Sequence, residues 1–138
     1  MKLLNLKIRI AILWVFMAAS ITLEIALYLY NEGQIENIIS GEAGITSGNL
    51  ILWTCRWLIP FILAFLTFSL TDKANRIVNL VFGIIVTVFN IFQFIMRLVT
   101  GQELPAFLVV ILFSSIVASV LILWYSIRWS KYQTRAIA

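Results

Sequence analysis

Four apolar segments of membrane length constrain the fold of this chain more than any other feature. The segments cover about residues 10–30, 50–70, 77–100 and 105–127. A helix needs roughly 20 apolar residues to cross a hydrocarbon core of about 30 Å. Because lipid offers no hydrogen-bond partner, a single segment of this length can satisfy its own backbone amides only as a helix. We therefore predict an all-α, integral membrane four-helix bundle in up-down-up-down order, with residues 1–138 as a single transmembrane domain.

The composition leaves little room for anything besides these helices. The 138 residues are 62% hydrophobic and 12% charged, and their mean hydropathy is +1.03. Such values lie far outside the range of soluble domains. The first segment exceeds the roughly 7–15 apolar residues of a signal peptide, so we expect an uncleaved helix. Residues 31–49 are the longest connection and are predicted to form an exterior loop.

Basic residues fall on one side of the predicted bundle, with only Asp72 as an acid among them, and the loops of the other side carry acids and no base. Cytoplasmic loops of membrane proteins carry an excess of lysine and arginine. We therefore predict that both termini are cytoplasmic in a multi-pass protein of the cell inner membrane. The bases are Lys2, Lys7, Arg9, Lys73, Arg76, Arg128, Lys131 and Arg135, and the acids of the opposite side are Glu32, Glu36, Glu42 and Glu103.

The residue types that most metalloproteins and redox enzymes use are scarce. The chain has one cysteine, Cys55, and no histidine, so it lacks a CxxC motif, an internal disulfide and the usual ligands of haem and zinc. We assign no catalytic residue, no metal ligand and no cofactor. The net charge of +4 follows from the cytoplasmic bases, so we expect no nucleic-acid partner. The lipid bilayer is the expected partner, and homo-oligomer formation stays open.

The third segment carries a polar stripe made of Asn79, Gly83, Asn90, Gln93 and Arg97. At about 100° per residue these positions fall within an arc of roughly 80°. We expect this face to turn away from lipid and pack against the other helices. Its outer end, from Asn90 to Arg97, is predicted to meet polar groups of other spans, whereas Asn79 and Gly83 are interpreted as helix packing.

The connection between the second and third spans is the six-residue stretch TDKANR at 71–76. So short a link predicts that these two spans are antiparallel neighbours. Thr71 or Asp72 is expected to cap the helix that follows.

Three ionisable side chains lie inside the predicted spans: Glu24, Arg56 and Arg97. Each costs several kcal/mol if it is left unpaired in hydrocarbon. At 1.5 Å per residue, Glu24 and Arg56 lie ~9 Å below the outer boundary and Arg97 lies ~4–5 Å below it. We predict a Glu24–Arg56 ion pair with Arg97 as a second cation, although for Arg97 alone snorkelling to the headgroups is the preferred interpretation.

Polar or small stripes on all four spans predict a polar interior that opens outward. Two arginines against one glutamate give this pocket a positive charge, which favours an anionic or amphipathic small molecule or a lipid. The ion pair is equally well explained as a structural staple and the serines as close-packing residues, so both interpretations stay open. The candidate ligand-binding residues are Ser20, Glu24, Tyr28, Arg56, Asn90, Gln93, Arg97 and Ser115.

Four stretches of the chain resemble a protein family. They are Ile12-Leu13-Trp14, GEAG at 41–44, DKANRIVNLVFGII at 72–85 and LILWYSIRW at 121–129. On these the chain resembles uncharacterised small bacterial four-span membrane proteins, a domain-of-unknown-function family that is loosely DoxX-like in size and topology. The resemblance implies a bacterial inner-membrane protein without an established activity. Relatives often carry further acidic residues where this chain has Arg56 or Leu58 and Ser115, which argues against a carboxylate-based mechanism.

Three functions compete on these observations. The first is a non-catalytic bundle that binds its ligand in the outer polar pocket. The second is a small proton-coupled multidrug-type exporter using Glu24, similar in outline to the small multidrug resistance transporters; Arg56 argues against it, because that mechanism needs an unpaired carboxylate. The third is a membrane enzyme, for which Glu24 is the only buried acid or base in sight. We favour the first and lean against enzymatic activity.

Overall fold

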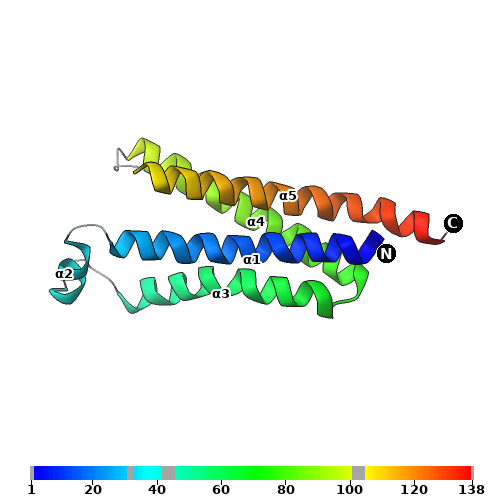
Figure 1. Cartoon of the computed structure of the whole chain (residues 1–138), viewed down its shortest axis with the longest axis horizontal. Coiled ribbons are helices and arrows are strands. Elements are labelled where there is room, and N and C mark those ends of the chain that lie inside the picture. The colour runs from blue at the N-terminus through cyan, green and yellow to red at the C-terminus, as the bar shows by residue number, and fades with distance from the viewer. Residues whose placement is uncertain (1, 31–32, 42–45, 101–104, 138) are drawn as a thin grey trace.

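A computed structural model of the chain describes residues 2–30, 33–41, 46–100 and 105–137. These residues are almost entirely helical, and no strand occurs among them. Four of the helices are long and apolar enough to cross a membrane. The predicted all-α helical bundle is therefore confirmed. The helices are α1 Lys2–Leu29, α2 Gln34–Ile39, α3 Ser47–Ser69, α4 Asp72–Val99 and α5 Ala106–Ile137 (Figure 1).

The four long helices run alternately in opposite directions, as predicted. The chain follows α1, returns along α3, and repeats this path with α4 and α5, so that both termini lie at one end and α2 lies at the other (Figure 1). We call the end with the termini the inner end and the end with α2 the outer end. The predicted exterior residues Glu32, Glu42 and Glu103 lie outside the described residues.

Two of the long helices extend well beyond the predicted apolar spans at the inner end. Helix α1 begins at Lys2 rather than near residue 10, and α5 continues to Ile137 rather than ending near residue 127. At 1.5 Å per residue the 28 residues of α1 are about 42 Å long, more than the roughly 30 Å of a hydrocarbon core. Lysine and arginine are good helix formers, so the basic flanks continue both helices past the apolar region.

Local signals explain where α4 begins and ends. Thr71 is extended, with φ −60° and ψ 152°, and its carbonyl accepts the Asn75 amide at 2.8 Å, so Thr71 is the N-cap residue although its side chain makes no capping hydrogen bond. Asp72 in the first turn places a negative charge at the positive end of the helix dipole. At the other end the Thr100 amide donates to the Met96 carbonyl at 2.9 Å.

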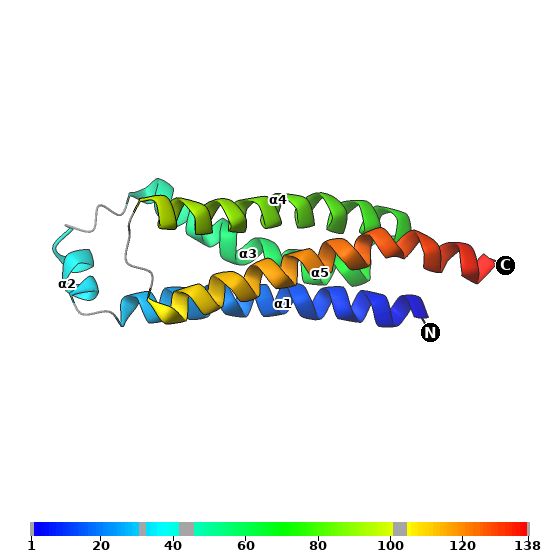
Figure 2. The same cartoon turned by 90° about the horizontal axis from the view of Figure 1, so that it is seen from above.

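The packing order of the helices differs from the order along the chain. Helix α1 packs along both α3 and α5, and α4 packs along α5 (Figures 1 and 2). Helices α3 and α4 contact each other far less, although the turn joins them directly. The prediction that these two spans are close neighbours is therefore wrong over most of their length. A short turn fixes only the adjacent helix ends, whereas side-chain packing decides how far the helices separate beyond it.

A cluster of buried apolar side chains, the core cluster, lies mainly in the inner half of the bundle. It combines large side chains such as Trp14 and Trp129, both fully buried, with alanines that let the helices approach closely. Most other large apolar side chains point outward, as expected for a surface that faces lipid. The core cluster consists of Leu6, Ile10, Trp14, Met17, Leu63, Ala64, Ala118, Ile122 and Trp129.

The buried face of α4 is polar or small, which confirms the predicted stripe and extends it to Asn75 and Thr87. No apolar residue is found among the described buried residues of this helix, which are Asn75, Asn79, Gly83, Thr87 and Asn90. A Cβ added at Gly83 would lie 2.9 Å from the Leu123 Cδ2 of α5, so glycine permits the close approach of these two helices. Gly83 is therefore a packing residue, as predicted.

Candidate functional site

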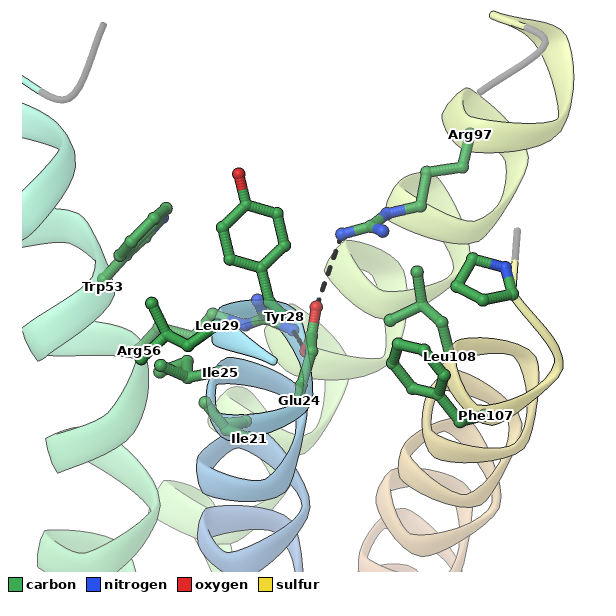
Figure 3. A pocket seen from close by; sticks show the side chains of 11 residues that line it. Ile21, Glu24, Ile25, Tyr28, Leu29, Trp53, Arg56, Arg97, Phe107 and Leu108 are labelled. Carbon is green, nitrogen blue, oxygen red and sulfur yellow. Dashed lines mark hydrogen bonds and ion pairs between the residues drawn. The ribbon is translucent and has the colours of Figure 1, made fainter. Parts of the chain in front are cut away.

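Three charged side chains from three helices converge near the outer end of the bundle. Glu24 of α1 accepts a hydrogen bond from Arg56 of α3, with 2.8 Å between Nη2 and Oε2. Arg97 of α4 donates to the other carboxylate oxygen, with 3.3 Å between Nη2 and Oε1. Figure 3 shows Glu24 between the two guanidinium groups. The predicted Glu24–Arg56 ion pair is confirmed, and Arg97 shares the same carboxylate.

The three side chains differ in how deeply they are buried. The side chain of Glu24 is 11% exposed, and those of Arg56 and Arg97 are 25% and 27% exposed. The Arg56 guanidinium also lies over the ring of Phe89, 5.9 Å from its centroid, within the usual range of a cation–π contact. Arg56 is therefore held by α1 and α4 together.

The Arg97 side chain reaches Glu24 by extending back toward the inner end of the bundle. Two contacts set the alignment of α1 and α4: the Lys7–Asp72 ion pair at 2.8 Å and the Trp14–Asn79 hydrogen bond at 2.6 Å. The same alignment places residue 89 level with Glu24, so Arg97 begins about two helical turns further out. Its side chain extends back toward Glu24 (Figure 3). The preferred interpretation of Arg97 as a snorkelling residue is therefore wrong, because the buried carboxylate offers a partner that the sequence does not reveal.

A cavity of about 350 Å³ adjoins the three charges. All four long helices contribute to its wall, which combines the two guanidinium groups and the carboxylate with an apolar side. Figure 3 shows the Tyr28 hydroxyl pointing toward the outer end, Trp53 above Arg56, and Phe107 and Leu108 on the side of Arg97. The lining residues are Ile21, Glu24, Ile25, Tyr28, Leu29, Trp53, Arg56, Arg97, Pro105, Phe107 and Leu108.

Four candidate residues do not line this cavity: Ser20, Asn90, Gln93 and Ser115. Ser20 is buried and its hydroxyl donates to the Phe16 carbonyl at 2.9 Å, so its hydrogen bond stays within its own helix. Ser115 is buried in α5, and Gln93 is half-buried on α4. The structure thus brings Glu24, Tyr28, Arg56 and Arg97 to the cavity and leaves these four beneath or beside it.

Asn90 differs from the other polar residues of the α4 stripe. It is 5% exposed, and its Nδ2 is a buried donor without a hydrogen-bond partner among the described residues. By the alignment of α1 and α4 it lies at about the level of Glu24. Asn90 therefore contributes an unused donor at the depth of the charged cluster, outside the wall of the cavity.

The apolar wall of the cavity was not predicted. Its members Ile21, Ile25, Leu29, Phe107 and Leu108 belong to helices in which most residues are apolar. In such segments a pocket-lining leucine or phenylalanine looks the same as one that faces lipid. Trp53 offered the best signal, because tryptophan near a membrane interface often presents its ring to a polar boundary.

A second polar cluster lies in the inner half of the bundle. The Trp14 indole N–H donates to the Asn79 Oδ1 at 2.6 Å. The side-chain amide of Asn79 donates to the side-chain oxygen of Asn75, and the side-chain amide of Asn75 donates to the backbone carbonyl of Thr67. These four residues, at most 1% exposed, link α1, α3 and α4. We call them the inner network. Asn79 is thus more than the plain packing residue that the sequence suggested, because it hydrogen-bonds across helices.

No group of three or more His, Cys, Asp or Glu side chains could hold a metal ion among the residues that the structure describes. Cys55 is exposed on α3 and has its thiol free. Glu24, Arg56 and Arg97, which we call the outer cluster, present two guanidinium groups and one carboxylate, so they can bind a partner by electrostatic attraction.

Comparison with known proteins identifies the family but no activity. Neither the curated proteins nor the solved structures gave a significant match. The looser similarity to DoxX-like proteins has no support in these comparisons. The family model DUF6326, described as a family of unknown function, matches residues 4–136, which is nearly the whole chain. The chain therefore belongs to the DUF6326 family, as the resemblance to a domain-of-unknown-function family implied.

Proposed function

We propose that this chain is a small bacterial inner-membrane protein that binds an anionic or amphipathic small molecule, or a lipid, in its outer cavity. One observation carries the proposal: the cavity of about 350 Å³ presents two guanidinium groups against one carboxylate. Structural ion pairs in membrane proteins are usually balanced, because an excess charge is costly in a low dielectric. An anionic guest would supply the missing negative charge.

The shape and lining of the cavity support the same conclusion. Small-molecule sites are typically about 300–1,000 Å³ in volume and combine an apolar wall with a few placed polar groups. Here the polar groups are Glu24, Arg56, Arg97 and Tyr28, and the remainder of the wall is apolar or aromatic. A guest with an acidic head and an apolar body matches both parts of the wall.

The orientation of the bundle belongs to the proposal. Bases such as Lys7, Lys73 and Arg128 lie in the parts of α1, α4 and α5 nearest the inner end, and Glu36 lies in α2 at the outer end. The positive-inside rule therefore favours a cytoplasmic inner end, with the cavity opening toward the outer leaflet.

Binding is tested with two amphiphiles of equal chain length and opposite charge. Purified protein in a neutral detergent is titrated with dodecanoate and, separately, with dodecyltrimethylammonium, and the melting temperature is measured. We expect dodecanoate to raise the melting temperature in a saturable way and dodecyltrimethylammonium not to do so. Equal effects of the two amphiphiles, or no effect of dodecanoate, would refute the proposal.

Two variants test whether dodecanoate binds in the cavity. The double variant Arg56→Gln/Arg97→Gln should lose the dodecanoate effect, whereas Lys73→Gln, which removes a positive charge at the inner end of α4, should keep it. If the double variant does not fold, 12-bromododecanoate provides a second measurement, because bromine quenches nearby tryptophans. Trp53 lines the cavity, so the Trp53→Phe variant should show less quenching than the wild type.

The exporter hypothesis remains a distinct alternative for the same residues. The Glu24 side chain is 11% exposed and lines the cavity, as a coupling carboxylate should. Both of its oxygens, however, accept hydrogen bonds from arginines, and a carboxylate that alternately binds protons and cations must be free to lose its partners. Proton release on addition of tetraphenylphosphonium to protein in detergent would favour the exporter; the binding proposal expects none.

A further inference from the structure

The two arginines of the outer cluster are held very differently. Charge-assisted N–H···O bonds usually measure about 2.7–2.9 Å between heavy atoms. The Arg56 bond to Glu24 has this length at 2.8 Å, whereas the Arg97 bond is longer at 3.3 Å. Arg56 also has Phe89 beneath its guanidinium, and no second partner for the Arg97 guanidinium is found in the described part of the chain. Arg97 is the less firmly held cation.

Arg97 is also the arginine on the side of the cavity that α5 forms. In Figure 3 it approaches Glu24 from the side of Phe107 and Leu108, while Arg56 approaches from the opposite side, below Trp53. A guest whose acidic group meets Arg97 can therefore lay its apolar body against α5. A guest bound to Arg56 would first have to displace a 2.8 Å ion pair and a ring contact.

The charges of the cluster set the charge of the guest. Glu24 neutralises one arginine, and Arg56 has the shorter bond to it, so one positive charge remains. We infer that Arg97 is the residue that binds the guest and determines its specificity, and that the guest is an amphiphile with a single negative charge. Its acid is a carboxylate or a phosphodiester, and Arg56 is a positioning residue that holds Glu24.

This inference rests on the proposed function and makes it more specific. A guanidinium presents two parallel N–H groups that match the two oxygens of a carboxylate or phosphate, and a lysine of equal charge does not. Exchange of arginine for lysine therefore removes the paired hydrogen bonds while it keeps the charge of the cluster. The two arginines can be compared in this way without altering the net charge of the cavity.

The experiment measures dodecanoate affinity by isothermal titration for the wild type, Arg97→Lys, Arg56→Lys and Arg97→Gln. Arg97→Lys should weaken binding by roughly 10-fold and Arg97→Gln by roughly 10- to 100-fold, as expected for loss of a charge-assisted bond. Arg56→Lys should change the affinity less than about 3-fold and lower the melting temperature instead. Equal losses in the two lysine variants, or a larger loss in Arg56→Lys, would overturn the assignment.

The charge of the guest is tested with dodecyl phosphate at pH 8, where the group carries about two negative charges. We expect dodecanoate to bind more tightly than dodecyl phosphate; tighter binding of the phosphate would refute the single-charge inference. If the wild type binds no anionic amphiphile, the proposed function itself fails, whereas binding that is insensitive to Arg97 removes only this inference.

A final arm separates the two sources of such an acid. Dodecanoate binding is repeated in nanodiscs with and without phosphatidylglycerol, whose headgroup also carries one negative charge. Competition by phosphatidylglycerol would assign the guest to membrane lipids, and absence of competition would assign it to free amphipathic acids. Both results agree with a singly charged guest, provided that Arg97→Lys weakens the binding of whichever compound is bound.

Discussion

The outer cluster and the inner network join the same helices but are built in opposite ways. Each connects α1, α3 and α4 by hydrogen bonds. The inner network is neutral, and its members are at most 1% exposed. The outer cluster is charged, its arginines are about a quarter exposed, and it adjoins a cavity. A closed neutral network suits a structural role, whereas an open cluster with excess charge suits the proposed binding of an anionic guest.

The arrangement of the helices explains why the two regions differ. Helices α3 and α4 are joined by a short turn at the inner end, where the side-chain amide of Asn75 also donates to the backbone carbonyl of Thr67. There the polar groups are at most 1% exposed, and Trp14 belongs to both the network and the core cluster. Toward the outer end, the described contact between α4 and α1 is made by the long side chain of Arg97. Side chains therefore leave a cavity between the helices there instead of a packed core.

The largest expected effect is on stability and comes from breaking the inner network. Asn79→Leu leaves the Trp14 indole N–H and the Asn75 side-chain oxygen without their partner in a fully buried site. Each stranded group costs about 1–3 kcal/mol in proteins, with values toward the lower end in membranes, so we expect a loss of about 2–3 kcal/mol. Reversible unfolding in mixed detergent measures it; a loss below about 0.5 kcal/mol would show that the network does not hold the helices.

A smaller effect is expected when the outer cluster loses its structural arginine. Arg56→Gln removes the 2.8 Å ion pair but leaves Glu24 with Arg97, which can move closer. Because the cluster is partly exposed, we expect about 1–2 kcal/mol rather than the roughly 3–5 kcal/mol of a fully buried pair. Lys73→Gln is the matched control and should leave the free energy of unfolding unchanged. A loss larger than that of Asn79→Leu would reverse the contrast between the two regions.

The smallest effect is expected at Asn90, which has the same residue type as Asn79 on the same helix face. Its Nδ2 has no described partner, so Asn90→Leu exchanges an unsatisfied buried donor for an apolar group of similar size. We expect stability to change by less than about 0.5 kcal/mol or to increase. Because Asn79→Leu and Asn90→Leu make the same exchange, the difference between their free energies of unfolding measures the contribution of the hydrogen bonds. Equal losses would mean that burial alone, rather than bonding, decides the cost.

The local pattern of the sequence determined much of this protein. Apolar segment length predicted the four spanning helices and their alternation, since a bilayer admits few other solutions. Helical periodicity predicted the buried face of α4, because residues three and four apart share a face. Glu24 and Arg56 could be paired from their equal depth, which follows from counting residues from the ends of their spans.

Only the tertiary structure decided which groups meet across helices. Periodicity states which face of a helix is buried but not which helix covers it, so the separation of α3 from α4 and the contact of Trp14 with Asn79 had no local signal. How far the helices rotate and shift against one another decides two further features. They are the direction of the Arg97 side chain toward Glu24 and the α5 wall formed by Phe107 and Leu108. Those shifts come from the packing of the whole bundle, which no single segment encodes.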